Sequence, residues 1–121
     1  MTPDLRPSLG RAGEAHAAAH LQRLGFHLVD RNYRTRWGEL DLVAFDGRVL
    51  VFCEVKTRRG PGRPFDALHG SKQRQVRHMA AAWLTEVTDR PHAPDLRFDA
   101  IGVSIDAHGQ LVRLEHLEAA F

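Results

Sequence analysis

Three charged residues interrupt two apolar segments in the middle of the sequence. Asp41 stands directly before Leu42–Phe45, whereas Glu54 and Lys56 follow Val49–Cys53. A carboxylate buried among apolar residues is costly unless a cation, a metal or a hydrogen-bond donor compensates its charge. Two carboxylates with a nearby lysine are the side chains that a magnesium-dependent site for phosphodiester hydrolysis requires. The pattern therefore predicts a metal site with hydrolytic chemistry.

The turn between the two apolar segments determines how their strands pair. Asp46-Gly47 is a strong hairpin signal, and a two-residue turn there pairs Phe45 with Arg48. Since side chains alternate between the faces of a strand, the charged side chains then project from one face of the sheet. This set consists of Glu39, Asp41, Glu54 and Lys56. A longer turn would keep these side chains on one face only if it shifted the strand pairing by an even number of residues.

The same register predicts how close the acids lie. Asp41 and Glu54 become diagonal neighbours with Cβ atoms roughly 7 Å apart or less, so both can bind one hard cation. Glu39 lies directly opposite Glu54, and like charges that face each other destabilise a sheet, which favours a divalent cation between them. The alternative is a structural ion pair between Lys56 and one of the acids.

Two further charged residues lie on predicted helices. Glu14 is on the alanine-rich face that should pack against the sheet, so its carboxylate either reaches the acidic residues or stays in solvent at the helix edge. Lys72 falls in the first turn of a later helix, one turn before the apolar Val76. It either points into the same cleft or is an ordinary surface lysine.

The predicted elements surround these residues with a small sheet. We expect helices at 8–24 and 71–87 and strands at 26–29, 33–45, 48–57, 98–105 and 111–114, with a basic loop at 58–64. The two central strands are apolar on both faces, so a helix should cover each side. The sequence predicts one α/β domain over residues 1–121, a sandwich around a mixed sheet of about five strands, with residues 1–7 as a loose N-terminal segment.

Positive charge gathers around the acids. The net charge is only +2, yet residues 31–77 carry eleven Lys and Arg against five Asp and Glu. A basic region around buried acids favours a polyanion such as nucleic acid, with a solvated charged surface as the alternative. The candidate nucleic-acid contacts are Arg34, Arg36, Arg58, Arg59, Arg63 and Lys72.

Cysteine and histidine usage excludes other site classes. Cys53 is the single cysteine, so an internal disulfide and a cysteine-based zinc site are excluded, and its place in a strand predicts a core residue. His16 and His20 are four residues apart but lack an H-E-x-x-H context, which favours a solvated helix face. No apolar segment approaches the roughly 20 residues of a membrane span and no secretory signal is seen, so a cytoplasmic protein is expected.

Five motifs together resemble a known protein family. They are Gly13-Glu14, Gly38-Glu39-Leu40-Asp41, Glu54-Val55-Lys56-Thr57-Arg58, Lys72 and Arg97-Phe98-Asp99-Ala100-Ile101-Gly102-Val103. In this order, over about residues 10–121, they are similar to the YraN family of small bacterial endonuclease-like proteins. That family in turn resembles the PD-(D/E)xK nuclease superfamily and its archaeal Holliday-junction resolvases. Leu40 stands where the superfamily's name has proline, which is usual in the YraN family.

The resemblance implies a restriction-endonuclease-like fold and a role for each matched residue. Asp41 and Glu54 would hold one or two Mg²⁺ ions, or Mn²⁺, with the Val55 carbonyl as a further ligand. Lys56 would orient or polarise the attacking water and stabilise charge on the phosphate. Glu14 would complete the metal shell.

The implied activity is Mg²⁺-dependent hydrolysis of phosphodiester bonds in DNA, including structured or branched DNA. Lys72 would assist at the phosphate. The motif itself does not explain Glu39, which either binds the metal or turns aside to an arginine. The alternative is a non-catalytic nucleic-acid-binding module on the same scaffold. The acids argue for catalysis, because a pure binder gains nothing from carboxylates that repel phosphate. Resolution of a junction would require a homodimer with two sites.

Overall fold

The computed structural model describes residues 9–60 and 70–121. In chain order the elements are α1 (Leu9–Arg23), β1 (His27–Thr35), β2 (Gly38–Phe45), β3 (Val49–Arg59), α2 (Gly70–Glu86), β4 (Asp95–Ile105) and β5 (Leu111–Leu117). The strands form one sheet in the order β1-β2-β3-β4-β5. All neighbours are antiparallel except β3 and β4, which are parallel and have α2 between them in the sequence. The predicted mixed sheet of five strands is confirmed.

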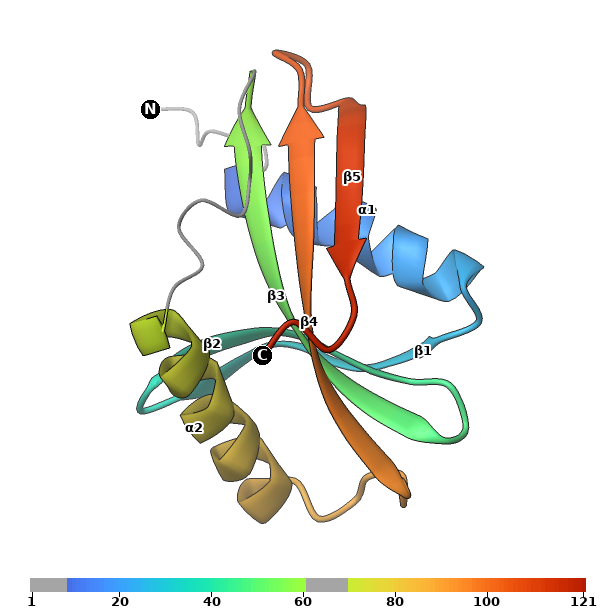
Figure 1. The fold of residues 1–121 in the computed structure, drawn as a ribbon, viewed down its shortest axis with the longest axis vertical. Coiled ribbons are helices and arrows are strands. Elements are labelled where there is room, and N and C mark those ends of the chain that lie inside the picture. Colours follow the sequence, from blue (N-terminus) through green and yellow to red (C-terminus); the bar gives the residue numbers. More distant parts are fainter. Residues whose placement is uncertain (1–8, 61–69) are drawn as a thin grey trace, which may run out of the picture.

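A helix covers each face of the sheet. Along β3, Val51 and Cys53 pack in a core with α1, whereas Leu50 and Phe52 pack in a core with α2. Figure 1 shows the two helices on opposite sides of the strands. The predicted α/β sandwich is therefore confirmed, and Cys53 is a buried core residue as expected. Within the described residues, neither helix has the length and apolar character needed to cross a membrane.

Helix α1 lies unusually close to β3 at Gly13. A β-carbon built on Gly13 would lie 1.7 Å from the Thr57 hydroxyl oxygen, far inside van der Waals contact. The Thr57 hydroxyl is itself buried and has no hydrogen-bond partner in the described part of the chain. A side chain at position 13 would therefore push the helix away from the strand, and Glu14 with it.

We expect Gly13→Ala to lower the free energy of unfolding by about 1–3 kcal/mol, because overpacking forces the helix or strand to shift. Gly10→Ala is the matched control on the same helix, since nothing lies within 4 Å of its β-carbon position. It should be neutral or stabilise the protein by up to about 1 kcal/mol. Urea unfolding of both variants measures the difference, and equal stabilities would contradict the close contact.

The boundary between the first two strands differs from the prediction. Residues 33–45 were expected to form one strand, but the chain turns at Arg36-Trp37 and residues 33–35 end β1. The Thr35 hydroxyl accepts a hydrogen bond from the Trp37 N–H and donates one to the Gly38 carbonyl, at 3.0 and 2.9 Å. Gly38 has a φ of 133°. The apolar pattern misses this turn because a threonine side chain, not a Gly-Asn or Asp-Gly pair, stabilises it.

The β2–β3 turn lies one residue beyond its predicted place. Phe45 pairs with Leu50 and not with Arg48. The Asp46 carboxylate accepts hydrogen bonds from the backbone N–H groups of Arg48 and Val49, at 2.9 and 2.8 Å, so Asp46 stabilises the turn from its flank. The register changes by two residues, an even number, and the relation between the faces of β2 and β3 is kept next to the turn.

The remaining boundaries agree with the prediction to within a few residues. Strand β3 continues through Arg58 and Arg59, which were expected in the basic loop, and β4 and β5 are each three residues longer than expected. The predicted loose segment 1–7 and residues 61–64 of the predicted loop lie outside the described residues.

Candidate active site

Strand β2 changes faces at Asp41. Leu40 belongs to the core beside α2, whereas Leu42 belongs to the core beside α1. Residues two apart on a regular strand share a face, so the alternation is interrupted between these leucines. The neighbouring position on β1 is Asn32, which has a φ of 53°. Asparagine tolerates this left-handed conformation better than most residues.

Strands β2 and β3 also separate at this point. Their pairing ends at Leu42–Cys53, and beyond it the Asp41 carboxylate accepts a hydrogen bond from the Val55 N–H at 2.8 Å. Figure 1 shows the two strands diverging from their common hairpin. A side chain thus replaces a backbone acceptor, and Asp41 lies in the opening between the strands.

Three carboxylates from two elements meet at this opening. Oxygen atoms of Glu14, Glu39 and Asp41 lie within 4.8 Å of one another. Asn32 Nδ2 donates to Glu14 at 2.6 Å and to Glu39 at 2.9 Å. Arg11 lies 3.5 Å from each of the same two glutamates. Of the two positions considered for Glu14, the carboxylate takes the one near the acidic residues.

Glu54 lies on the other side of Asp41, with two lysines. Its side chain is 3% exposed, and one carboxylate oxygen is 3.5 Å from Lys56 Nζ and 3.2 Å from Lys72 Nζ. Lys72 therefore points toward the acidic residues and is not an ordinary surface lysine, which agrees with the first of the two alternatives for this residue. The ion pair between Lys56 and an acid is also present, with Glu54 as the partner.

The expectation that Glu39 directly opposes Glu54 was wrong. The shifted register would place Glu39 beside Lys56, and the face change at Asp41 turns Glu39 toward α1. There it contacts Asn32 and Arg11, while Glu54 faces the start of α2. Asp41 lies between the two groups. The expected shared face of all four charged residues is therefore wrong for Glu39.

The electrostatics single out Asp41. Burial raises the pKa of Asp41 to about 8, with the negative charges of Glu54 and Glu14 adding to the effect and the Val55 hydrogen bond opposing it. Among the residues that the structure describes, no lysine or arginine lies within ion-pair distance of Asp41. Four carboxylates, one of them without a cation, form a donor set of hard oxygens that suits Mg²⁺ or Mn²⁺.

The raised pKa of Asp41 predicts how stability depends on pH without metal. The folded state keeps a proton that the unfolded state releases between about pH 4 and pH 8, so the contribution of Asp41 to stability falls as pH rises through that window. Asp41→Asn removes this fall. In urea unfolding with EDTA, we expect the variant to match wild type near pH 4 and to exceed it increasingly toward pH 8, by at most about 1.4 kcal/mol per pH unit. A difference that does not change with pH would contradict this environment.

The predicted nucleic-acid contacts have different surroundings. Arg34 is 88% exposed and 4.0 Å from Glu39, while the Arg36 guanidinium lies over the Trp37 ring. Arg58 and Arg59 are exposed at the end of β3. Arg63 lies outside the described residues. Contact of these side chains with nucleic acid stays a prediction, as does metal binding by the Val55 carbonyl.

Sequence reasoning missed Asn32 and Arg11, the two residues that position the glutamates. Asn32 gives one signal, because the polar run Asp30–Asn32 interrupts a β-strand pattern and contains a residue that tolerates positive φ. Arg11 gives none, because an exposed arginine near a helix start is common. Only the approach of α1 to β1 and β2 gives these side chains a role.

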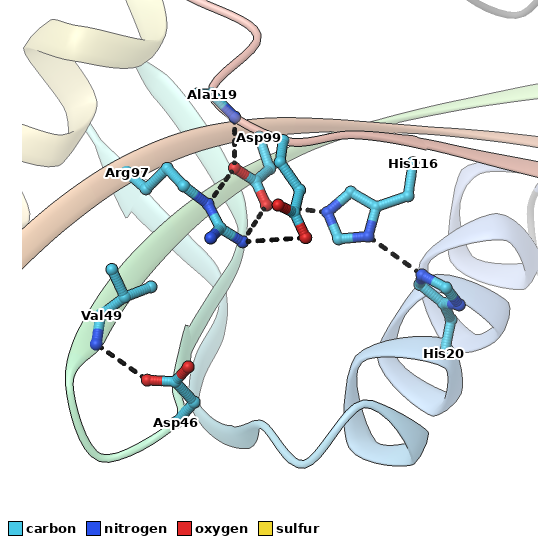
Figure 2. Close-up of polar contacts among 8 residues, drawn as sticks. His20, Asp46, Val49, Arg97, Asp99, His116 and Ala119 are labelled. Atoms are coloured by element: carbon cyan, nitrogen blue, oxygen red, sulfur yellow. Dashed lines mark hydrogen bonds and ion pairs between the residues drawn. The ribbon is translucent and has the colours of Figure 1, made fainter.

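A second buried polar cluster lies where β4, β5 and α1 meet (Figure 2). Asp99 is fully buried and accepts hydrogen bonds from the Arg97 guanidinium at 2.8 and 2.9 Å and from the Ala119 N–H at 3.0 Å. Its carboxylate is also 2.7 Å from His116, whose other ring nitrogen is 3.0 Å from His20. Burial raises the pKa of Asp99, but these hydrogen bonds outweigh it and leave the pKa below its ordinary value.

The histidines of α1 do not form the solvated face that was favoured. His20 contacts His116, and His16 contacts the Gly109 carbonyl at 3.0 Å. Burial, followed by the nearby His116 and Arg23, lowers the pKa of His20. Both histidines therefore link α1 to the β4–β5 hairpin and do not project together into solvent.

Comparison with known proteins identifies the family. Residues 13–103 match the group described as Uncharacterised protein family UPF0102, and the match includes every carboxylate of the site. The chain belongs to this family. UPF0102 is the YraN family, so the resemblance carried by the motifs is confirmed.

Relatives within UPF0102 match nearly the full chain. A UPF0102 protein of Frankia casuarinae is 50% identical over 119 residues, covering 96% of this chain and 98% of the relative. One from Rhodococcus opacus is 45% identical over 116 residues, covering 94% and 96%. One from Geobacter sulfurreducens is 48% identical over 117 residues, covering 93% and 88%. The family description names no activity, so function has to be argued from the site.

Proposed function

We propose that this UPF0102 protein is a Mg²⁺-dependent endonuclease that hydrolyses phosphodiester bonds in DNA, including structured or branched DNA. The observation that carries the proposal is Asp41, a largely buried carboxyl without a cation partner among the described residues, placed between two glutamates on one side and Glu54 on the other. The Val55 N–H needs an acceptor in this opening but not a charged one, and a divalent ion would compensate the charge.

At such a site, the residues of the chain would have different roles. Asp41, Glu54, Glu14 and the Val55 carbonyl would hold the ion, with Glu39 as an auxiliary ligand. When bound, the ion supplies Lewis-acid stabilisation and lowers the pKa of a coordinated water. The Val55 N–H fixes one Asp41 oxygen, and the other would bind the ion. Binding requires Asp41 to lose its proton, so metal affinity should rise with pH.

Lys56 and Lys72 supply positive charge next to this site. Both ammonium groups form ion pairs with the same carboxylate oxygen of Glu54. Either lysine would be able to turn from Glu54 toward a phosphate, where a positioned cation stabilises the charge that develops in the transition state. Lys56 would also orient the attacking water. The exposed arginines along β1 and β3 would contact the backbone on either side.

One observation favours a second candidate, a non-catalytic nucleic-acid-binding module. Two lysines already neutralise Glu54 without a metal, as a structural ion-pair network would. The two functions differ at Asp41, since a binding module gains nothing from a carboxyl that is costly to ionise. Replacing Asp41 should then leave DNA affinity unchanged or increase it, and no cleavage should occur with any metal.

Incubating the protein with linear, nicked, flap and four-way-junction DNA, and with matching RNA, tests the proposal. We expect cleavage with Mg²⁺ or Mn²⁺ and none with EDTA. Asp41→Asn protein, purified in the same way, controls for contaminating nucleases. Equal cleavage by wild type and Asp41→Asn, or no cleavage of any substrate, would contradict the proposal. Mass in solution at several concentrations tests the homodimer that junction cleavage would need, and a cytoplasmic location remains part of the proposal.

A further inference from the structure

The turn between β1 and β2 holds an exposed tryptophan in a fixed position. Trp37 is 39% exposed, and its ring stacks on His78 of α2 with centroids 4.4 Å apart and planes 19° from parallel. The Arg36 guanidinium lies 4.7 Å from the ring centroid. Gln75 donates a hydrogen bond to the Trp37 carbonyl at 2.6 Å, and Thr35 accepts one from its N–H. The ring is therefore ordered without being part of the core.

A cavity of about 420 Å³ opens beside this stack. Trp37 and Arg36 form one side, and the exposed face of α2, with His78 and two alanines, forms the other. Cavities of this size that combine aromatic rings with a few polar groups are typical small-ligand sites. His78 covers the Trp37 ring on one side and the Arg36 guanidinium lies over it, so a base that stacks on Trp37 has to displace the Arg36 side chain from the ring.

The polar groups of the cavity suit a nucleobase better than a phosphate. Glu86 lines it, and burial together with the nearby Glu86 carboxylate raises the pKa of the Tyr33 hydroxyl. A carboxylate repels phosphate but accepts hydrogen bonds from the amino groups of cytosine, adenine and guanine. Arg36 provides a cation for the backbone of the same nucleotide. Thymine has no amino group and should bind less well.

The cavity is also within reach of the acidic residues. Trp37 precedes Asp41 by four residues, which corresponds to roughly 13 Å along an extended strand. A nucleic acid strand spans this distance in a few nucleotides. A base inside a duplex cannot stack on a protein ring, so the occupant has to be unpaired or turned out of the helix.

We propose that the cavity between Trp37 and α2 binds one unpaired nucleobase of a DNA strand whose backbone runs to the carboxylates. This inference rests on the proposed function for its nucleic-acid partner, and it predicts a preference for branched or gapped DNA. A base stacked on an aromatic ring contributes about 1–3 kcal/mol, which corresponds to roughly 5- to 150-fold in affinity.

Fluorescence of 2-aminopurine in DNA tests the proposal without cleavage. The probe carries the base unpaired in a gapped duplex or paired in a full duplex, and the protein is titrated in EDTA. Wild type should quench the unpaired probe and leave the paired probe unchanged. Trp37→Ala and His78→Ala should weaken quenching at least about 5-fold, Trp37→Phe should retain part of it, and the exposed Leu96→Ala on β4 should match wild type.

Three results would overturn the inference. They are quenching that is independent of Trp37, equal quenching of paired and unpaired probes, and free dAMP competing as strongly as the gapped DNA. Thermal melts of each variant test whether Trp37 has only a packing role. In that case Trp37→Ala would lower the melting temperature and leave DNA binding unchanged. Cleavage with Mg²⁺ is measured separately. Trp37-dependent quenching without cleavage would contradict the proposed nuclease activity and support the base site. Cleavage with quenching that is independent of Trp37 would support the nuclease activity and contradict the base site.

Discussion

Asp41→Asn should lower the rate of Mg²⁺-dependent DNA cleavage by about 10³-fold. The substitution keeps an acceptor for the Val55 N–H, so the opening between β2 and β3 is preserved. It removes the charge that would hold the ion, and a metal contributes several kcal/mol of transition-state stabilisation, at about 1.4 kcal/mol per tenfold in rate. Single-turnover cleavage of the preferred substrate at saturating protein gives the rate directly.

Stability separates this loss from unfolding. Asp41→Asn should be at least as stable as wild type near neutral pH without metal, since it removes a carboxyl with a raised pKa. Glu54→Gln should also lose cleavage, because its carboxylate would be a ligand. Asp95→Asn is the matched control, since Asp95 is an exposed aspartate on β4 paired with Arg48. Full activity of Asp41→Asn would reject the catalytic site.

Asp99→Ala should lower the free energy of unfolding by about 3–5 kcal/mol. Asp99 is fully buried and the substitution removes the acceptor for the Arg97 guanidinium, for His116 and for the Ala119 N–H (Figure 2). Removing one partner of a buried ion pair is costly because the other charge is left without compensation. Urea unfolding at pH 7 measures the loss.

Asp95→Ala is the control for a carboxylate–arginine pair on the same strand. Arg48 and Asp95 are 3.2 Å apart, but their side chains are 79% and 51% exposed, so the loss should stay below about 1 kcal/mol. Asp99→Asn keeps a hydrogen-bond acceptor, so its loss of stability should lie between those of Asp95→Ala and Asp99→Ala. This variant allows the test even if Asp99→Ala does not fold. Similar losses for Asp99→Ala and Asp95→Ala would contradict a stabilising role for the buried cluster.

The sequence predicted the layers of this protein because its apolar segments are unambiguous. Residues 49–53 are apolar on both faces of a strand, and each of the two helices has one apolar face. Such patterns leave little choice but a central sheet covered on both sides. The acids that follow these strands were found for the same reason, since a charge next to a buried segment stands out.

The sequence could not predict how β2 turns at Asp41. Alternation along a strand assumes regular pairing, but the β2–β3 pairing ends at Leu42, next to the positive φ of Asn32 on β1. Glu39 therefore moves to the side of α1, which no count along the strand reveals. The turn at Arg36-Trp37 was missed for a related reason, because the Thr35 side chain and Gln75 of α2 supply its hydrogen bonds. Local patterns miss features that depend on contacts between elements.

The most direct test of the metal site is the anomalous difference density of crystals soaked in Mn²⁺. We expect one strong peak at the opening between β2 and β3, about 2.1–2.2 Å from an Asp41 oxygen, with Glu54 as a second ligand. At least one of Lys56 and Lys72 should then have left Glu54. A saturated soak without a peak beside Asp41, with both lysines still on Glu54, would contradict the proposed metal site.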